Sequence, residues 1–76
     1  MKIEVLGDGC SRCSRLYENV LKAVNLIEKE VEVVKEMDPQ KISDYKVKSL
    51  PALVIDGVVK TAGKVPKVEE IKGWME

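Results

Sequence analysis

The sequence predicts an α/β fold of order βαβαββα, in which helices pack on the faces of a four-stranded mixed sheet. Short runs rich in β-branched residues alternate with segments whose apolar residues recur every three or four positions, so strands alternate with helices. The last two strands instead join through Asp56-Gly57, a dipeptide typical of two-residue hairpins. A helical crossover gives parallel neighbours and a hairpin gives antiparallel ones, so the sheet is mixed.

The first half of the chain is expected to form a strand, a long helix and a second strand. Residues 2–6 alternate polar and apolar side chains and end at a Gly-Asp-Gly turn. An amphipathic helix is expected from Ser11 to about Glu28. Residues 30–37 have the pattern of a half-exposed or edge strand, with Val31 and Val33 facing one way.

The second half of the chain adds a short helix, the hairpin and a last helix. Asp38-Pro39 is a favourable helix start, because Asp accepts hydrogen bonds from backbone N–H groups and Pro suits the first helical position. That helix is expected to run to about Tyr45. The remaining elements are expected at 52–55, at 58–61 and from Pro66 onward.

The composition indicates one small folded domain over residues 1–76. A chain of 76 residues buries too little surface to support two cores. The 13 basic and 13 acidic residues cancel, which disfavours nucleic-acid binding. The apolar run after Met1 is too short for a signal peptide and no stretch reaches membrane-spanning length, so we expect no membrane association and a cytoplasmic protein. The Lys- and Glu-rich composition, with two Asn and one Gln, hints at a thermophile.

Cys10 and Cys13 form a CxxC motif at the predicted start of the first helix. Residues three apart on a helix have Cβ atoms about 5–6 Å apart, which is compatible with a disulfide. The positive end of the helix dipole favours a thiolate there. Two cysteines are too few for the framework of a secreted miniprotein, so a chemical role is favoured. We expect the N-terminal Cys10 to be the nucleophile and Cys13 to resolve the mixed disulfide.

Two charged residues near the motif act in opposite directions on a thiolate. Arg12, between the cysteines, would stabilise it, whereas Asp8 would oppose it. If Arg12 dominates, the reduced form is stabilised and the protein is more oxidising. The alternative is that Arg12 is a solvated surface charge.

The strand-CxxC-helix segment and a distant Leu50-Pro51-Ala52-Leu53-Val54-Ile55-Asp56-Gly57 run together resemble the thioredoxin superfamily. The chain most resembles the small archaeal and bacterial "redox-active disulfide" proteins of that superfamily. The resemblance implies that Pro51 follows a cis peptide bond and faces the CxxC, and that Leu50 offers its backbone to an extended substrate peptide. It also implies a thiol–disulfide oxidoreductase that acts on protein disulfides and is served by a reductase. We expect a monomer with no cofactor.

The sequence also departs from thioredoxin. Ser11-Arg12 stands between the cysteines where thioredoxin has Gly-Pro, so the redox potential does not carry over. Thioredoxins have a buried Asp six residues before the first Cys, and that offset falls on Glu4. Glu4 is therefore a candidate proton acceptor for Cys13, or else, as the residues favour, part of a partly solvated strand end.

Two other functions use the same features. Copper carriers also place a CxxC before a helix, because soft thiolates bind Cu(I); here Asp8 stands where such carriers have Met, and the predicted order differs from their βαββαβ. A non-catalytic adaptor would keep the fold without the chemistry. A structural zinc site needs more than two cysteines, and the chain has no His, so no metal is expected.

Overall fold

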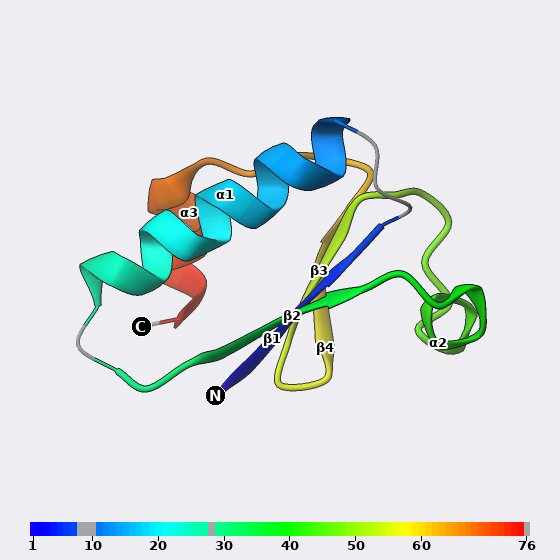
Figure 1. Cartoon of the computed structure of the whole chain (residues 1–76), viewed down its shortest axis with the longest axis horizontal. Helices are drawn as coiled ribbons and strands as arrows, with labels where there is room; N and C mark the ends of the chain where they lie inside the picture. Colours follow the sequence, from blue (N-terminus) through cyan, green and yellow to red (C-terminus); the bar gives the residue numbers. More distant parts are fainter. Residues whose placement is uncertain (8–10, 28, 76) are drawn as a thin grey trace.

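The predicted order of elements is confirmed in the computed structural model, which describes residues 1–7, 11–27 and 29–75 (Figure 1). The elements over these residues are β1 (Lys2–Leu6), α1 (Ser11–Leu26), β2 (Glu32–Glu36), α2 (Pro39–Asp44), β3 (Ala52–Ile55), β4 (Val58–Ala62) and α3 (Val68–Met75). In these described ranges, no helix has both the length and the apolar character needed to cross a membrane.

The sheet is mixed, with the strand order β2-β1-β3-β4. β1 is parallel to β2 and antiparallel to β3, and the hairpin places β4 antiparallel to β3. Of the two alternatives for this strand, half-exposed or edge, the edge position is the one observed for β2. Figure 1 shows α1 and α3 together on one face, with α2 apart from them.

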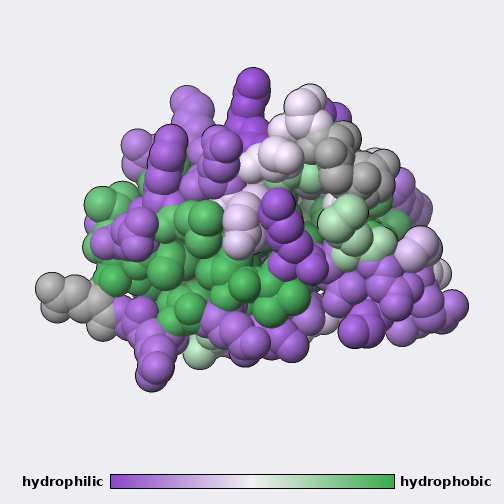
Figure 2. Space-filling model, in the orientation of Figure 1, coloured by the Kyte–Doolittle hydropathy of each residue, from purple (hydrophilic) through white to green (hydrophobic). Residues whose placement is uncertain are grey.

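The core has two parts because side chains of β1 alternate between the faces of the sheet. Ile3 and Val5 pack with α1 and α3 in the larger cluster, whereas Leu6 belongs to a smaller cluster near α2. The larger cluster is lined toward the surface by partly buried apolar residues, and hydrophobic side chains reach the surface over α1 and β2 (Figure 2). β1 therefore has two different chemical environments, one on each face.

Four elements have boundaries that differ from the prediction, and the smallest difference is that β4 ends at Ala62 rather than Thr61. α1 ends at Leu26 rather than near Glu28, which itself lies outside the described residues. β2 is shorter than residues 30–37, because its ladder pairs it residue for residue with the five residues of β1. α3 begins at Val68 rather than Pro66.

The start of α3 has a physical reason in its hydrogen bonds. The Pro66 carbonyl accepts a bond from Asn19 Nδ2 at 3.0 Å, which holds this residue against α1. The Glu70 carboxylate then accepts a bond from the Lys67 backbone N–H, the return half of a capping box. The helix consequently starts after Lys67.

The turn residues predicted from sequence behave as expected. Asp56 and Gly57 have φ values of 50° and 83°, which a two-residue hairpin turn of type I′ requires. Asp38 caps α2 by accepting a bond from the Gln40 N–H at 2.9 Å, and Pro39 is the first helical residue. Both dipeptides therefore fix the element boundaries beside them.

Candidate active site

Cys13 is positioned by the buried stripe of α1. The stripe consists of residues at spacings of three and four, namely Cys13, Leu16, Val20 and Ala23. Cys13 belongs to the first turn of the helix and is 6% exposed. Cys10, the predicted nucleophile, lies outside the described residues; α1 begins at the following position, Ser11.

Gly7 allows the Cys13 side chain to approach the end of β1. A Cβ atom added to Gly7 would lie 2.4 Å from Cys13 Sγ and 2.8 Å from its Cβ, closer than atoms can pack. The Gly7 N–H meanwhile donates to the Glu36 carbonyl at 3.1 Å, so the backbone here is held by β2. The absence of a side chain at this position is therefore what places the Cys13 sulfur against the sheet.

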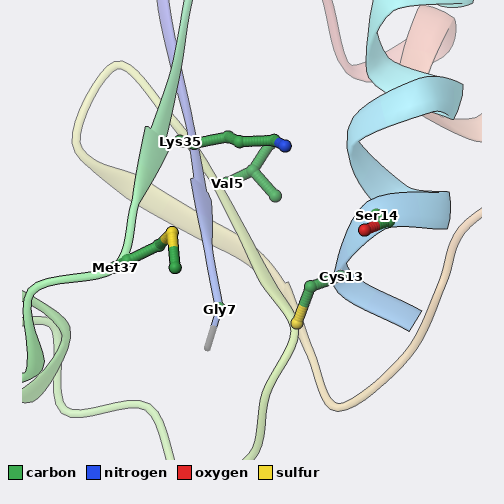
Figure 3. Close-up of a pocket in the computed structure, with 6 residues that line it drawn as sticks. All are labelled: Val5, Gly7, Cys13, Ser14, Lys35 and Met37. Atoms are coloured by element: carbon green, nitrogen blue, oxygen red, sulfur yellow. The ribbon is translucent and has the colours of Figure 1, made fainter. Parts of the chain in front are cut away.

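The Cys13 side chain borders a small pocket between α1, β1 and β2 (Figure 3). Its lining residues are Val5, Gly7, Cys13, Ser14, Lys35 and Met37. Met37 is 56% exposed, so the pocket lies at the surface of the protein. Lys35 provides the pocket's charged side chain, and its Nζ lies 4.5 Å from the centroid of the Tyr17 ring on α1.

Pro51 lies at the same end of the sheet as Gly7. The β1–β3 ladder ends with Leu6 opposite Ala52. Gly7 directly follows Leu6 in the sequence, and Pro51 directly precedes Ala52. The Leu50-Pro51 bond is cis, as the resemblance implied, and Pro51 is fully buried. Leu50 is half-buried and packs on the smaller core cluster. Because Gly7 also contacts Cys13, the two distant sequence motifs meet at one end of the central strands β1 and β3.

Arg12 connects the start of α1 to the loop after β4. Its guanidinium donates a hydrogen bond from Nη2 to the Gly63 carbonyl. The Gly63 N–H in turn donates to the Pro51 carbonyl at 2.8 Å. Gly63 has a φ of 78°, and an added Cβ would lie 2.8 Å from Ser49 Cβ, so glycine is required there. Arg12 is exposed, and its guanidinium is held by this hydrogen bond.

Glu4 lies on the other face of the sheet from Cys13. It alternates with Ile3 and Val5, which face α1, so its side chain lies on the α2 face. There its carboxylate accepts a hydrogen bond from the Tyr45 hydroxyl and lies 3.6 Å from Lys2 Nζ. The structure does not bring Glu4 and Cys13 together, and this placement disfavours direct proton transfer between them.

The Glu4 carboxylate changes the titration of its partner. It raises the pKa of the Tyr45 phenol first through this hydrogen bond, then with burial and the negative charges of Glu4 and Glu36. Lys41 offsets the charge of Glu36 at 3.7 Å. These groups form a structural network around α2.

Comparison with known proteins agrees with this geometry. The family model described as "Thioredoxin domain" matches residues 1–76. The thioredoxin of Methanocaldococcus jannaschii is 41% identical over 70 residues, which are 92% of this chain and 80% of that protein. The thioredoxin of Methanothermobacter thermautotrophicus is 42% identical over 74 residues, covering 95% of this chain and 94% of that protein. The chain belongs to the thioredoxin family.

This membership confirms the predicted activity, which is that of a protein thiol–disulfide oxidoreductase. The family implies protein disulfides as substrates and a reductase as partner. Relatives from thermophilic archaea also agree with the heat-adapted composition. The copper-carrier and adaptor alternatives are not favoured, and the observed βαβαββα order differs from that of the copper carriers.

Sequence reasoning missed two residues of this thioredoxin-family site. The sequence pattern indicates Gly7 only as a strand terminator and gives no indication of Lys35. Gly7 carries a usable signal, because a glycine at the end of the strand that precedes a CxxC motif allows close approach of the following helix. Lys35 is found by counting alternate residues of β2 from Val33, which places both on the α1 face.

Proposed function

We propose that Cys10 attacks and Cys13 resolves in the thiol–disulfide exchange of this protein. The Cys10 thiolate bonds to one sulfur of a substrate disulfide and releases the other sulfur as a thiolate. The Cys13 thiolate then attacks the Cys10 sulfur, closes the Cys10–Cys13 disulfide and releases the second substrate thiolate. Two electrons pass from the dithiol to the substrate, and the reverse sequence oxidises a substrate dithiol.

The burial of Cys13 is the observation that carries this assignment of roles. Its side chain packs against Gly7 and is 6% exposed, so an incoming protein disulfide has little access to it. Cys10 directly precedes the first residue of α1, where unpaired N–H groups and the helix dipole favour a thiolate. A buried second cysteine suits an intramolecular attack, because its partner sulfur comes from the same motif.

Leu50 and Pro51 are proposed to hold the backbone of an extended substrate peptide. The support is their place just before β3, where the strand register puts Pro51 near Gly7. Gly7 contacts Cys13, so these residues lie at the same end of the sheet as Cys13. Leu50 itself lies before the strand, outside the β1–β3 ladder. A peptide bound there would lie across the dithiol.

Reduction of insulin by dithiothreitol tests the roles of the cysteines. We expect Cys10→Ser and Cys13→Ser each to abolish the catalysed rate. Only Cys13→Ser should accumulate a mixed disulfide with substrate, because it keeps the nucleophile and lacks the resolving thiol. Full activity in either variant would contradict the proposed exchange, and trapping by Cys10→Ser instead would reverse the two roles.

The same trapped complex tests the peptide site. In a mixed disulfide between Cys13→Ser protein and a cysteine peptide, we expect NMR shifts and slowed amide exchange at Leu50 and Ala52. Residues 58–60 of β4 serve as the control, since Val58 pairs with Ile55, at the end of β3 away from Ala52. Equal perturbation at both places would contradict a peptide site at Leu50.

The direction of electron flow depends on the potential of the Cys10/Cys13 couple. Related dithiols range from roughly −270 to −120 mV, which separates reductants from oxidants. We propose a reductant that acts as a monomeric single domain in the cytoplasm, supported by the reducing conditions that keep cytoplasmic dithiols open. A potential of about −120 mV would contradict a reductant.

The monomeric state is tested separately by light scattering, in which a mass that rises with protein concentration would contradict a monomer.

A further inference from the structure

The loop after β4 is held along the first half of α1 by two hydrogen bonds. Arg12 Nη2 donates to the Gly63 carbonyl at the start of the loop, and Asn19 Nδ2 donates to the Pro66 carbonyl at 3.0 Å near its end. Arg12 and Asn19 are seven residues apart in sequence, which is about 10 Å along the helix axis. Figure 1 shows this stretch of chain passing beside the first turns of α1. The exposed loop residue Lys64 therefore lies alongside these turns of the helix.

The chain before β3 also meets this loop. The Gly63 N–H donates to the Pro51 carbonyl at 2.8 Å, and a Cβ added to Gly63 would lie 2.8 Å from Ser49 Cβ. Lys48 directly precedes Ser49, and Lys64 directly follows Gly63. Both lysines are exposed. Each therefore stands one residue from a contact beside Pro51, at the dithiol end of the sheet.

Two arginines extend this positive charge onto α1. Arg12 and Arg15 are exposed on its first turns, and residues three apart on a helix are neighbours. We define the basic rim as the four residues Arg12, Arg15, Lys48 and Lys64. None of the four forms an ion pair with an acidic residue of the described part of the chain. The first described acidic residue along α1 is Glu18, and Asp8 lies outside the described residues.

The rim contrasts with the zero net charge of the whole chain. Residues 45–68 contain five lysines and one acidic residue, Asp56. Asp56 follows the far end of β3, where its side chain accepts a hydrogen bond from the Lys2 backbone N–H at 2.8 Å. The charges of Lys48 and Lys64 therefore have no balancing acid at their own end of this segment. Like charges gathered in this way repel one another, and an anionic partner relieves that repulsion.

We propose that the basic rim binds acidic residues flanking the disulfide of a protein substrate, so that acidic substrates are selected. The inference rests on the proposed function in that the substrate peptide lies at Leu50 and Pro51, two and three residues after Lys48. An extended peptide advances about 3.3 Å per residue, so carboxylates within a few residues of the reacting cysteine come within reach of the rim. Charge complementarity raises the rate of encounter and rejects basic partners.

Three disulfide peptides that differ only in their flanking residues test this preference. The residues beside the cysteine are glutamate, glutamine or lysine. At low salt we expect kcat/KM for reduction to be about tenfold higher for the glutamate peptide than for the glutamine peptide, and lowest for the lysine peptide. The advantage should shrink at 1 M salt, where the screening length is about 3 Å. Equal values for the three peptides would overturn the proposal.

A pair of double variants separates the rim from net charge. Lys48→Gln with Lys64→Gln should lower the preference for the glutamate peptide about threefold or more. Lys22→Gln with Lys60→Gln is the matched control, because it removes the same charge from exposed lysines on the second half of α1 and on β4. The control should keep the preference. An equal loss in both double variants would assign the effect to net charge and overturn the role of the rim.

Binding without exchange gives a readout that does not depend on cysteine chemistry. In protein carrying Cys10→Ser and Cys13→Ser, a glutamate peptide with serine in place of cysteine should shift the NMR amide signals of Lys48 and Lys64, and the lysine peptide should not. No shift, or a response to a single-stranded oligonucleotide instead, would overturn the proposal. Failure of the parent protein to reduce any peptide would contradict the proposed function, while this titration would still decide the role of the rim.

Discussion

The two faces of β1 show how one strand can serve two purposes. On the α1 face, Val5 and Gly7 lie beside the Cys13 side chain, in a pocket whose charge comes from Lys35. On the α2 face, the Glu4 carboxylate is engaged by Tyr45 and Lys2. Because neighbouring residues of β1 face opposite sides of the sheet, the Cys13 thiol and this network of paired polar groups lie on different faces.

This difference shows why an offset counted along the chain is a weak guide to a catalytic carboxylate. Glu4 lies six residues before Cys10, the spacing of a buried Asp in thioredoxins, yet its side chain leaves the sheet on the face opposite Cys13. A carboxylate that is 14% exposed needs partners. Tyr45 and Lys2 are those partners, and they account for the largely buried Glu4 carboxylate without a catalytic role.

Gly7→Ala is expected to have the largest effect on the α1 face. Its Cβ would clash with Cys13 Sγ at 2.4 Å, so either the helix start or the end of β1 must move. Overpacking of this kind costs about 1–3 kcal/mol in the free energy of unfolding. Chemical denaturation and insulin reduction would both detect the displacement, and an unchanged variant would show that the approach of Cys13 to β1 is not required.

Gly73→Ala is the control for that substitution. Gly73 lies within α3, and an added Cβ meets no atom within 4 Å. Alanine has the higher helix propensity, so this variant should be more stable by up to about 1 kcal/mol. A lower free energy of unfolding in Gly7→Ala and a higher one in Gly73→Ala would tie the effect at Gly7 to its contact with Cys13.

The fold could be predicted from sequence because its signals are local. Alternation, helical spacing and the Asp56-Gly57 and Asp38-Pro39 dipeptides each act over a few residues, and the element order followed from them. The start of α3 at Val68 could not be predicted in the same way, because a tertiary contact acts there, the bond from Asn19 to the Pro66 carbonyl.

The candidate site was only partly predictable for the same reason. The CxxC spacing and Leu50-Pro51 are short patterns, and the structure places Cys13 and Pro51 at the same end of the sheet. The partners of Arg12 and Lys35 lie 51 and 18 residues away, in Gly63 and Tyr17. No local pattern indicates such pairs; they follow from the register of the strands and the position of α1.

Arg12→Ala tests whether the α1 face is held by hydrogen bonding or by charge. Arg12 donates to the Gly63 carbonyl, and Gly63 donates to Pro51. Losing one such bond costs about 0.5–1.5 kcal/mol, so we expect chemical denaturation to show a free energy of unfolding lowered by up to that amount. Arg12→Lys, which keeps the charge but not the guanidinium geometry, should resemble Arg12→Ala. Full rescue by Lys, with a Cys10 pKa that rises only in Arg12→Ala, would favour a charge effect on the thiolate.

Glu4→Gln should have the smallest effect on exchange, and it tests the separation of the two faces. We expect the rate of insulin reduction and its pH profile to match those of the parent, because Glu4 faces α2 rather than Cys13. A shifted pH profile would contradict that separation. On its own face, the substitution should lower the pKa of Tyr45, since the hydrogen bond to Glu4 is the leading cause of its raised value.

The raised pKa of Tyr45 also has a definite sign for stability. The phenol is harder to ionise in the folded protein than in the unfolded chain, where its pKa is about 10. Its contribution is therefore complete below pH 10 and is lost as the pH rises above 10, through the folded-state value. Chemical denaturation between pH 8 and 11 should show this alkaline loss in the parent and a smaller loss in Tyr45→Phe. Tyr17→Phe is the matched control, and an equal change in both variants would contradict the role of Glu4.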